Sequence, residues 1–191
     1  MTKKEIIWRE ILYQALERKV FKFTQQDLAK KFNYSVSTVF NALKVPRQSG
    51  AVKVTGRYFE VTDAEKLLIV WATFRRLEKE IIYQTRVNLP PEKITGLLPS
   101  EAVLTGYAGY QQRFGSAPAD FDKVHVYAAN PSAIKQRFPF QPGNPNLIVI
   151  KADDQLLDYS QLPLAQLYVD LWNFKDWQAK DFLAALTKKI L

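Results

Sequence analysis

The sequence predicts an α+β protein built from two domains. Amphipathic helices and a β-hairpin fill the first third of the chain, and strands alternate with helices in the rest. The excess of positive charge is confined to the first third: residues 1–57 hold 12 Lys and Arg against 4 Asp and Glu, whereas residues 58–191 hold 15 of each kind. This asymmetry indicates a basic module joined to an electrically balanced one.

The composition predicts a folded chain outside the membrane. With 47% apolar and 24% charged residues, the 191-residue chain has enough hydrophobic surface for a packed core. The apolar stretch at residues 67–74 is too short to cross a bilayer, and Arg9 and Glu10 interrupt the segment where a signal peptide needs its apolar stretch. The absence of cysteine excludes disulfides and Cys-ligated zinc. We expect a cytoplasmic protein with no membrane partner.

The first three predicted elements are helices. Ile7, Ile11 and Ala15 form an apolar stripe over residues 3–18, and Arg9 and Glu10 lie off that stripe.

Residue types that cap helices mark the beginnings of the second and third predicted helices. Thr24 precedes a helix over residues 25–32, and Ser35 can cap a third helix by accepting from its free amides. Pro46 is predicted to stop this third helix near Lys44.

Two alternating runs at residues 51–54 and 57–61 flank Thr55-Gly56 and predict a β-hairpin, because glycine accepts the positive φ of a tight turn. Helix, helix, turn, helix and hairpin is the order of a winged helix-turn-helix domain. We place this domain at residues 1–61, and a small mixed α/β domain at residues 62–191.

The third helix has a polar arc of about 120° and an opposed apolar arc of about 100°. The polar arc holds Ser37, Thr38, Asn41 and Lys44, and the apolar arc holds Val36, Val39, Phe40 and Leu43. We expect the apolar arc to pack in the core and the polar arc to read double-stranded DNA in the major groove, since Asn pairs with adenine and Lys reaches guanine or phosphate.

Further cations are expected to hold the DNA backbone. Arg57 at the hairpin tip and Lys53 would act as a wing on phosphates or the minor groove, and Lys30, Lys31 and Arg47 would contact phosphates nearby. Such contacts position the protein without specifying a sequence.

The second domain alternates strands and helices. Strands are predicted at residues 81–87, 102–105, 123–128 and 147–151. Helices are predicted at residues 63–79 behind Thr62, from Pro90, at residues 107–114, 132–138 and 163–173, and from a cap at Asp176 to about Ile190.

Motifs of enzymes are lacking in this domain. The seven glycines form no dinucleotide-binding, P-loop or nucleophile-elbow motif, so no cofactor is predicted. The single histidine, His125, lies in a predicted strand, where it is interpreted as a surface or core residue and not as a catalyst. We expect no enzymatic activity.

One carboxylate pair supports an alternative. Asp120 and Asp122 enter a predicted strand two residues apart and could share a divalent ion, with Asp153 or Asp154 as a third ligand, as in a metal-dependent nucleotidyltransferase. Residues 104–109 lack the Gly-Ser pair that such enzymes use, and acidic residues at strand ends also form turns.

Aromatic residues gather near the start of the last helix and in a Gly-rich turn. The first group is Tyr168, Trp172, Phe174 and Trp177, and the turn adds Tyr107 and Tyr110. Core packing or a dimer contact explains them, and a ligand pocket is the alternative.

Four segments carry a resemblance to a known family. They are LPSEAVLTGYAGY at residues 98–110, DKVHVY at 122–127, NPNLIVI at 144–150 and LPLAQLYVDLW at 162–172. Behind a winged helix, they resemble the AbiEi-type antitoxin and regulator family of type IV toxin–antitoxin systems, over roughly residues 1–190. The resemblance implies a domain that represses its own operon, a second domain for antitoxin action or assembly, and a nucleotidyltransferase toxin as partner.

The charge distribution and the order of elements predict a DNA-binding transcriptional regulator. The family resemblance implies that this regulator is an autoregulating antitoxin. A homodimer would present two recognition helices about 34 Å apart to a palindromic operator. Two alternatives stay open, the nucleotidyltransferase and a winged-helix scaffold for protein contacts.

Overall fold

The computed structural model describes all 191 residues and confirms the α+β fold class. Two compact units divide the chain. The first comprises Met1–Arg75, Pro163–Val169 and Lys189–Leu191, and the second comprises Arg76–Leu162 and Asp170–Lys188. This division falls at Arg75 and not at the predicted boundary between residues 61 and 62. Helix α4 (Ala64–Phe74) belongs to the first unit, where Leu67, Leu68 and Trp71 are buried.

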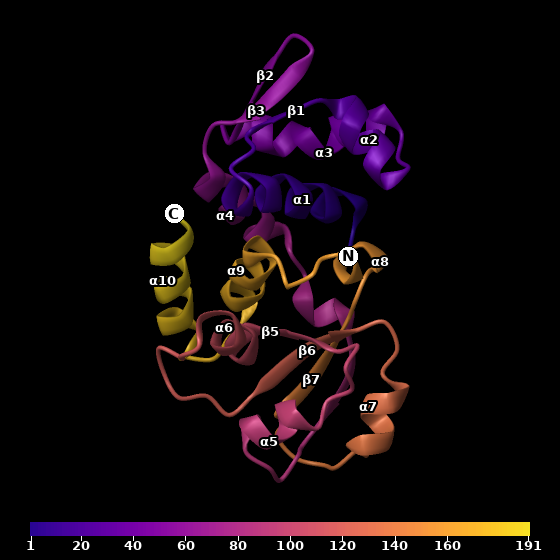
Figure 1. Ribbon diagram of the computed structural model, residues 1–191, viewed down its shortest axis with the longest axis vertical. Coiled ribbons are helices and arrows are strands. Elements are labelled where there is room, and N and C mark those ends of the chain that lie inside the picture. The colour runs from indigo at the N-terminus through magenta and orange to yellow at the C-terminus, as the bar shows by residue number, and fades with distance from the viewer. The chain divides into compact units, whose positions relative to one another are not determined.

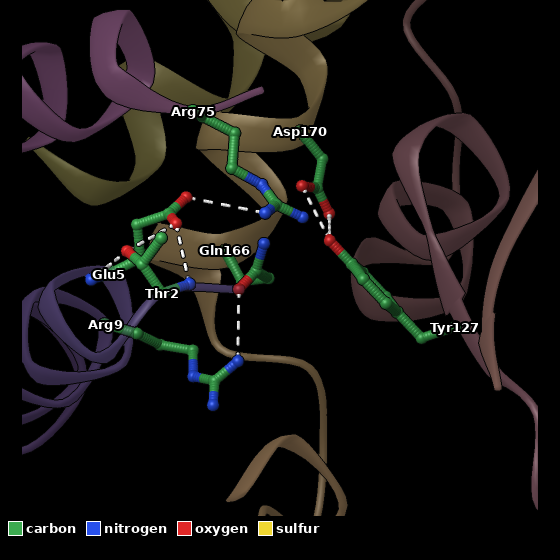
Figure 2. A network of polar contacts seen from close by, with 7 residues as sticks. All are labelled: Thr2, Glu5, Arg9, Arg75, Tyr127, Gln166 and Asp170. Atoms are coloured by element: carbon green, nitrogen blue, oxygen red, sulfur yellow. Dashed lines mark hydrogen bonds and ion pairs between the residues drawn. The ribbon is translucent and has the colours of Figure 1, made fainter. Parts of the chain in front are cut away.

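Helix α1 (Lys3–Glu17) has the predicted apolar stripe, and a capping box between Thr2 and Glu5 begins it. Arg9 and Glu10, which lie off this stripe, are buried as well. Other parts of the first unit cover these side chains. Arg9 donates to Gln166 over 3.3 Å (Figure 2). Glu10 accepts from Lys31.

Helices α2 (Gln25–Phe32) and α3 (Val36–Gln48) begin where predicted, at Thr24 and Ser35, whose hydroxyls accept from backbone amides three residues on. The predicted end of α3 near Lys44 is wrong, since the helix continues through Pro46. In a regular helix the N–H of residue 46 would donate to the carbonyl of Ala42. Here the indole of Trp8 donates to that carbonyl over 2.8 Å, which replaces the missing helix bond.

The predicted hairpin is confirmed as β2 (Val52–Thr55) and β3 (Tyr58–Val61), with Thr55 opposite Tyr58 and Gly56 at φ 57° in the two-residue loop. A short strand that was not predicted, β1 (Lys22–Phe23), pairs with β3, so the sheet order is β1-β3-β2. In Figure 1 the hairpin projects beyond the helices of its unit.

The cap of α4 differs from the prediction. Asp63 and not Thr62 caps the helix, by accepting from the amide of Lys66, while the Thr62 hydroxyl donates to the carbonyl of Gly50. The helix ends at Phe74, five residues before the predicted end at 79.

The second unit contains a four-stranded sheet with short helices. Its elements are the 3-10 helix η1 (Leu77–Glu80), β4 (Ile81–Thr85), α5 (Pro91–Gly96), β5 (Val103–Thr105), α6 (Gly106–Phe114), β6 (Val124–Ala128), α7 (Ser132–Arg137), β7 (Leu147–Lys151), α8 (Asp154–Leu157), α10 (Ala179–Ile190) and the last part of α9 (Leu164–Asn173). The strand order is β4-β7-β6-β5, with β6 and β7 parallel and both outer pairs antiparallel.

Both faces of this sheet are covered. One face buries Val126 and Val149 against Ile94 of α5 and Ile134 of α7. The other face carries the alternate residues of the same strands, which include His125, Tyr127 and Ile148. Among them Tyr127 donates over 2.8 Å to the buried carboxylate of Asp170 (Figure 2). The same carboxylate accepts from Thr105.

The predicted cap at Asp176 is not observed. Helix α10 begins three residues later, at Ala179, and the Asp176 carboxylate accepts from Lys123 and from the hydroxyl of Tyr107. None of the helices is both long enough and apolar enough to span a membrane.

Candidate nucleic-acid interface

The residues of the predicted polar arc of α3 face outward. Ser37, Asn41, Lys44 and Arg47 are exposed, and Thr38 is half-buried. The Ser35 hydroxyl, which caps the helix, lies 3.0 Å from that of Ser37 and 2.9 Å from that of Thr38. The first turn therefore presents a cluster of hydroxyls, and the later turns present an amide and two cations.

The predicted apolar arc of α3 is partly wrong. Val36 and Phe40, expected in the core, are 46% and 42% exposed. The core face is instead formed by Val39, Ala42, Leu43 and Pro46. This face is rotated by about 60° from the predicted arc, because the packing of α1 on α3 brings Trp8 to Ala42.

The hairpin and α2 contribute exposed cations to the same unit. Lys53 on β2, Arg57 in the hairpin loop and Lys30 in the last turn of α2 are all exposed. Lys31 is also exposed, but its ammonium forms an ion pair with Glu10, which is 2% exposed. Glu10 therefore neutralises part of the Lys31 charge. Of the predicted phosphate contacts, we expect Lys31 to add least to DNA affinity.

The surface of residues 1–57 is more positive than the sequence count indicates. Of the 12 cations, 10 are exposed, because only Lys4 is half-buried and Arg9 buried. Of the 4 carboxylates only Asp27 is exposed, since Glu17 is half-buried and Glu5 and Glu10 are buried.

The buried carboxylates have partners inside the first unit. Glu5 accepts from the amide and hydroxyl of Thr2 at 2.9 and 2.8 Å, and from Arg75 at 3.4 Å (Figure 2). Glu17 accepts from the amide of Leu164 at 2.8 Å. Folding therefore buries most carboxylates of residues 1–57 and leaves most of their cations exposed, which favours a polyanionic partner.

The sequence reasoning missed two more exposed residues on the sheet of this unit. Lys22 on β1 lies over the ring of Tyr58 on β3, with its Nζ 5.4 Å from the ring centroid. A two-residue strand has no periodicity, so the pairing of β1 with β3 that brings them together has no local signal.

The second unit has a pocket of about 190 Å³ over the sheet face that carries His125. Ile81, Ile148 and Ile150 line it together with Phe174, whose ring stacks on His125 at 4.0 Å between centroids. Burial lowers the pKa of His125 to about 3, so the imidazole is neutral. Two ion pairs, Lys123 with Asp176 and Lys175 with Glu78, also line the pocket and balance its charge.

The aromatic residues predicted to cluster divide between core and surface. Tyr107 and Tyr110 are buried against Phe182, at 4.8 and 5.3 Å between ring centroids, and burial raises the pKa of both hydroxyls. Tyr168 is buried too, whereas Trp172 and Trp177 are 41% and 71% exposed.

The carboxylates considered for a metal site are not gathered into one. Asp120, Asp122 and Asp154 are exposed. Asp153 caps α8 by accepting from the amide of Leu156. No group of three or more His, Cys, Asp or Glu side chains is placed to hold a metal ion.

Comparison with family models, with curated proteins and with solved structures finds no match for this chain. The resemblance to the AbiEi-type family therefore remains an expectation from the sequence.

Proposed function

We propose that this chain is a DNA-binding transcriptional regulator, in which the first unit acts as a winged helix-turn-helix and α3 lies in the major groove. The observation that carries the proposal is the surface of residues 1–57, where ten exposed cations stand against one exposed carboxylate. Duplex DNA carries one negative charge per ~1.7 Å of its axis, so such a surface gains affinity by releasing counterions.

The residues divide by role. Ser37 and Asn41 on the outer face of α3 would meet base edges, and Lys44 and Arg47, further along the same helix, would reach phosphates or guanine. Arg57 in the hairpin loop would contact the backbone or the minor groove as a wing.

The second unit would sense a ligand, dimerise or dock a partner, in the cytoplasm. A homodimer would match a palindromic operator, and the resemblance adds a nucleotidyltransferase toxin as partner. Light scattering of the purified chain, alone and with the product of a neighbouring nucleotidyltransferase gene, tests both.

The test of DNA binding is a salt titration. If about five phosphates are neutralised, log K for a fluorescent random-sequence duplex against log[salt] has a slope of about −4 to −5. The triple variant Lys44→Ala/Arg47→Ala/Arg57→Ala should lose about 2.7 of that slope, or roughly three fifths, if each cation neutralises one phosphate. A matched triple variant of exposed lysines in the second unit, Lys93→Ala/Lys180→Ala/Lys188→Ala, should keep it. A salt-independent response, or equal losses in both triple variants, would remove the proposal.

A further inference from the structure

The exposed face of α3 changes in character along the helix. Its first two turns present Val36, Ser37, Phe40 and Asn41, none of them charged. Its last turns present Lys44 and Arg47, as well as Gln48. In a helix that enters the major groove, the N-terminal residues are the ones that contact base edges. The base-reading part of α3 is therefore an amide and a hydroxyl beside two large apolar side chains.

The apolar pair is well defined in space. Val36 and Phe40 lie four residues apart and so on one edge of the helix, beside Ser37 and Asn41. The Nζ of Lys44 lies 5.6 Å from the centroid of the Phe40 ring. The two side chains are still 46% and 42% exposed, so burial of the rest against a partner would be favourable.

The charge of the first unit indicates which kind of partner fits the edge formed by Val36 and Phe40. Lys44 lies at the Phe40 ring, and the first 57 residues expose ten cations against one carboxylate, so a polyanion that also presents apolar groups fits this edge. The C5-methyl of thymine is the one apolar group that the major groove presents.

We propose that the first half of α3 reads A·T base pairs, with Val36 and Phe40 packing on thymine methyls and Asn41 pairing with adenine. This inference rests on the proposed function and names its substrate, a duplex site in which A·T pairs face the first half of the helix. No Arg or Lys projects from this half, so no bidentate guanine contact competes there.

The test replaces thymine by uracil, which removes the methyl and leaves the hydrogen-bonding edge unchanged. Duplexes that bind the full chain are first selected from a random pool, and each thymine of the selected site is then replaced singly. Burying one methyl corresponds to about fourfold in affinity. We expect a loss of this size at one or two positions and none at the others.

Variants assign the loss to α3. Phe40→Ser should bind thymine and uracil duplexes equally, and more weakly than the unaltered chain binds thymine. Ile69→Ser, which removes another exposed apolar side chain of the same unit, should keep the thymine preference.

The outcomes separate the two proposals. Binding without any thymine–uracil difference overturns the inference alone, as does a Phe40→Ser variant that keeps the difference. A Phe40→Ser variant that changes the oligomeric state and not the thymine preference overturns it too, in favour of a protein contact. Absence of duplex binding at about 50 mM salt, where electrostatic binding is strong, overturns the proposed function itself.

Discussion

The indole N–H of Trp8 donates a 2.8 Å hydrogen bond to the carbonyl of Ala42, the one carbonyl of α3 that Pro46 deprives of its helical donor. Trp8 is fully buried and its ring meets Phe74 edge to face at 5.5 Å. One side chain of α1 thus allows α3 to continue past a proline and fixes the two helices against each other.

Trp8→Phe should lower the free energy of unfolding by about 1–3 kcal/mol, because it leaves a buried carbonyl without a donor. Pro46→Ala restores a backbone N–H that can donate to Ala42. In the Pro46→Ala background the loss from Trp8→Phe should therefore shrink by about 1 kcal/mol. Urea unfolding of the four proteins of this cycle measures the coupling. The same loss in both backgrounds would show that the indole contributes by packing alone.

A second prediction concerns pH. Burial lowers the pKa of His125 to about 3, against 6.5 for an unperturbed imidazole; Asp176 opposes the shift and Lys123 adds to it. Between these values the unfolded chain binds a proton that the folded chain does not, so stability falls as pH falls through this window. Below pH 6.5 the slope approaches about 1.4 kcal/mol per pH unit.

His125→Phe keeps an aromatic ring against Phe174 and removes the titration. Its unfolding free energy should depend less on pH between 6 and 5 than that of the unaltered chain, by about the slope of one proton. Because the chain has a single histidine, its ring proton signals in NMR report on this site alone. A His125 signal that titrates near pH 6.5 in the folded protein would contradict the burial.

Local rules account for most element limits. Thr24 and Ser35 cap α2 and α3 where their hydroxyls can accept from free amides, and Gly56 takes the positive φ of the hairpin turn. These signals lie within a few residues of the feature they predict, so a sequence contains them in full.

The errors concern side chains whose surroundings come from distant parts of the chain. Arg9 is buried because Gln166, 157 residues later, lies beside it, and no periodicity of α1 contains that partner. Phe40 lies at the edge of the predicted apolar arc, where the packing of α1 on the other side of α3 decides its exposure. The candidate interface was therefore predictable as a polar face and a charge excess, and its apolar edge was not.

A third prediction tests the contact between Gly106 and Phe174. Gly106 begins α6 at φ 60°, and a Cβ at this position would overlap the Phe174 ring. Gly115, at φ 78° with open space around it, is the matched control. Gly115→Ala should cost about 1–2 kcal/mol for the backbone conformation alone. Gly106→Ala should cost more, because Phe174 must also move.

A displacement of the Phe174 ring in Gly106→Ala can also be measured through the pKa of His125. Phe174 stacks on His125, so a shifted ring exposes the imidazole to water and should raise its pKa from about 3 toward 6.5. NMR titration of His125 in Gly106→Ala measures this change, and in Gly115→Ala the value should stay low. Equal losses of unfolding free energy in the two alanine variants, with an unchanged pKa of His125, would contradict the contact between Gly106 and Phe174.

The final prediction separates two neighbouring lysines of α2 by what each contacts. Lys30 is exposed and Lys31 is paired with Glu10, whose side chain is 2% exposed. Lys31→Ala leaves Glu10 buried with one partner fewer, although the Gln14 amide still donates to it at 2.9 Å. We expect a loss of about 1–2 kcal/mol in the free energy of unfolding, below the roughly 3–5 kcal/mol of a fully buried broken pair, because the Lys31 side chain is half exposed.

Lys30→Ala should leave stability unchanged within about 0.5 kcal/mol and lower duplex affinity, with a salt slope smaller by about 0.9 if it neutralises one phosphate. Chemical unfolding gives the stability loss of each variant, and the salt titration gives the loss of duplex affinity of each variant. The pairing of Lys31 with Glu10 predicts the larger stability loss for Lys31→Ala and the larger binding loss for Lys30→Ala. The reverse assignment would mean that Lys31 leaves Glu10 to meet the phosphate, and that the ion pair of the free protein is not kept on DNA.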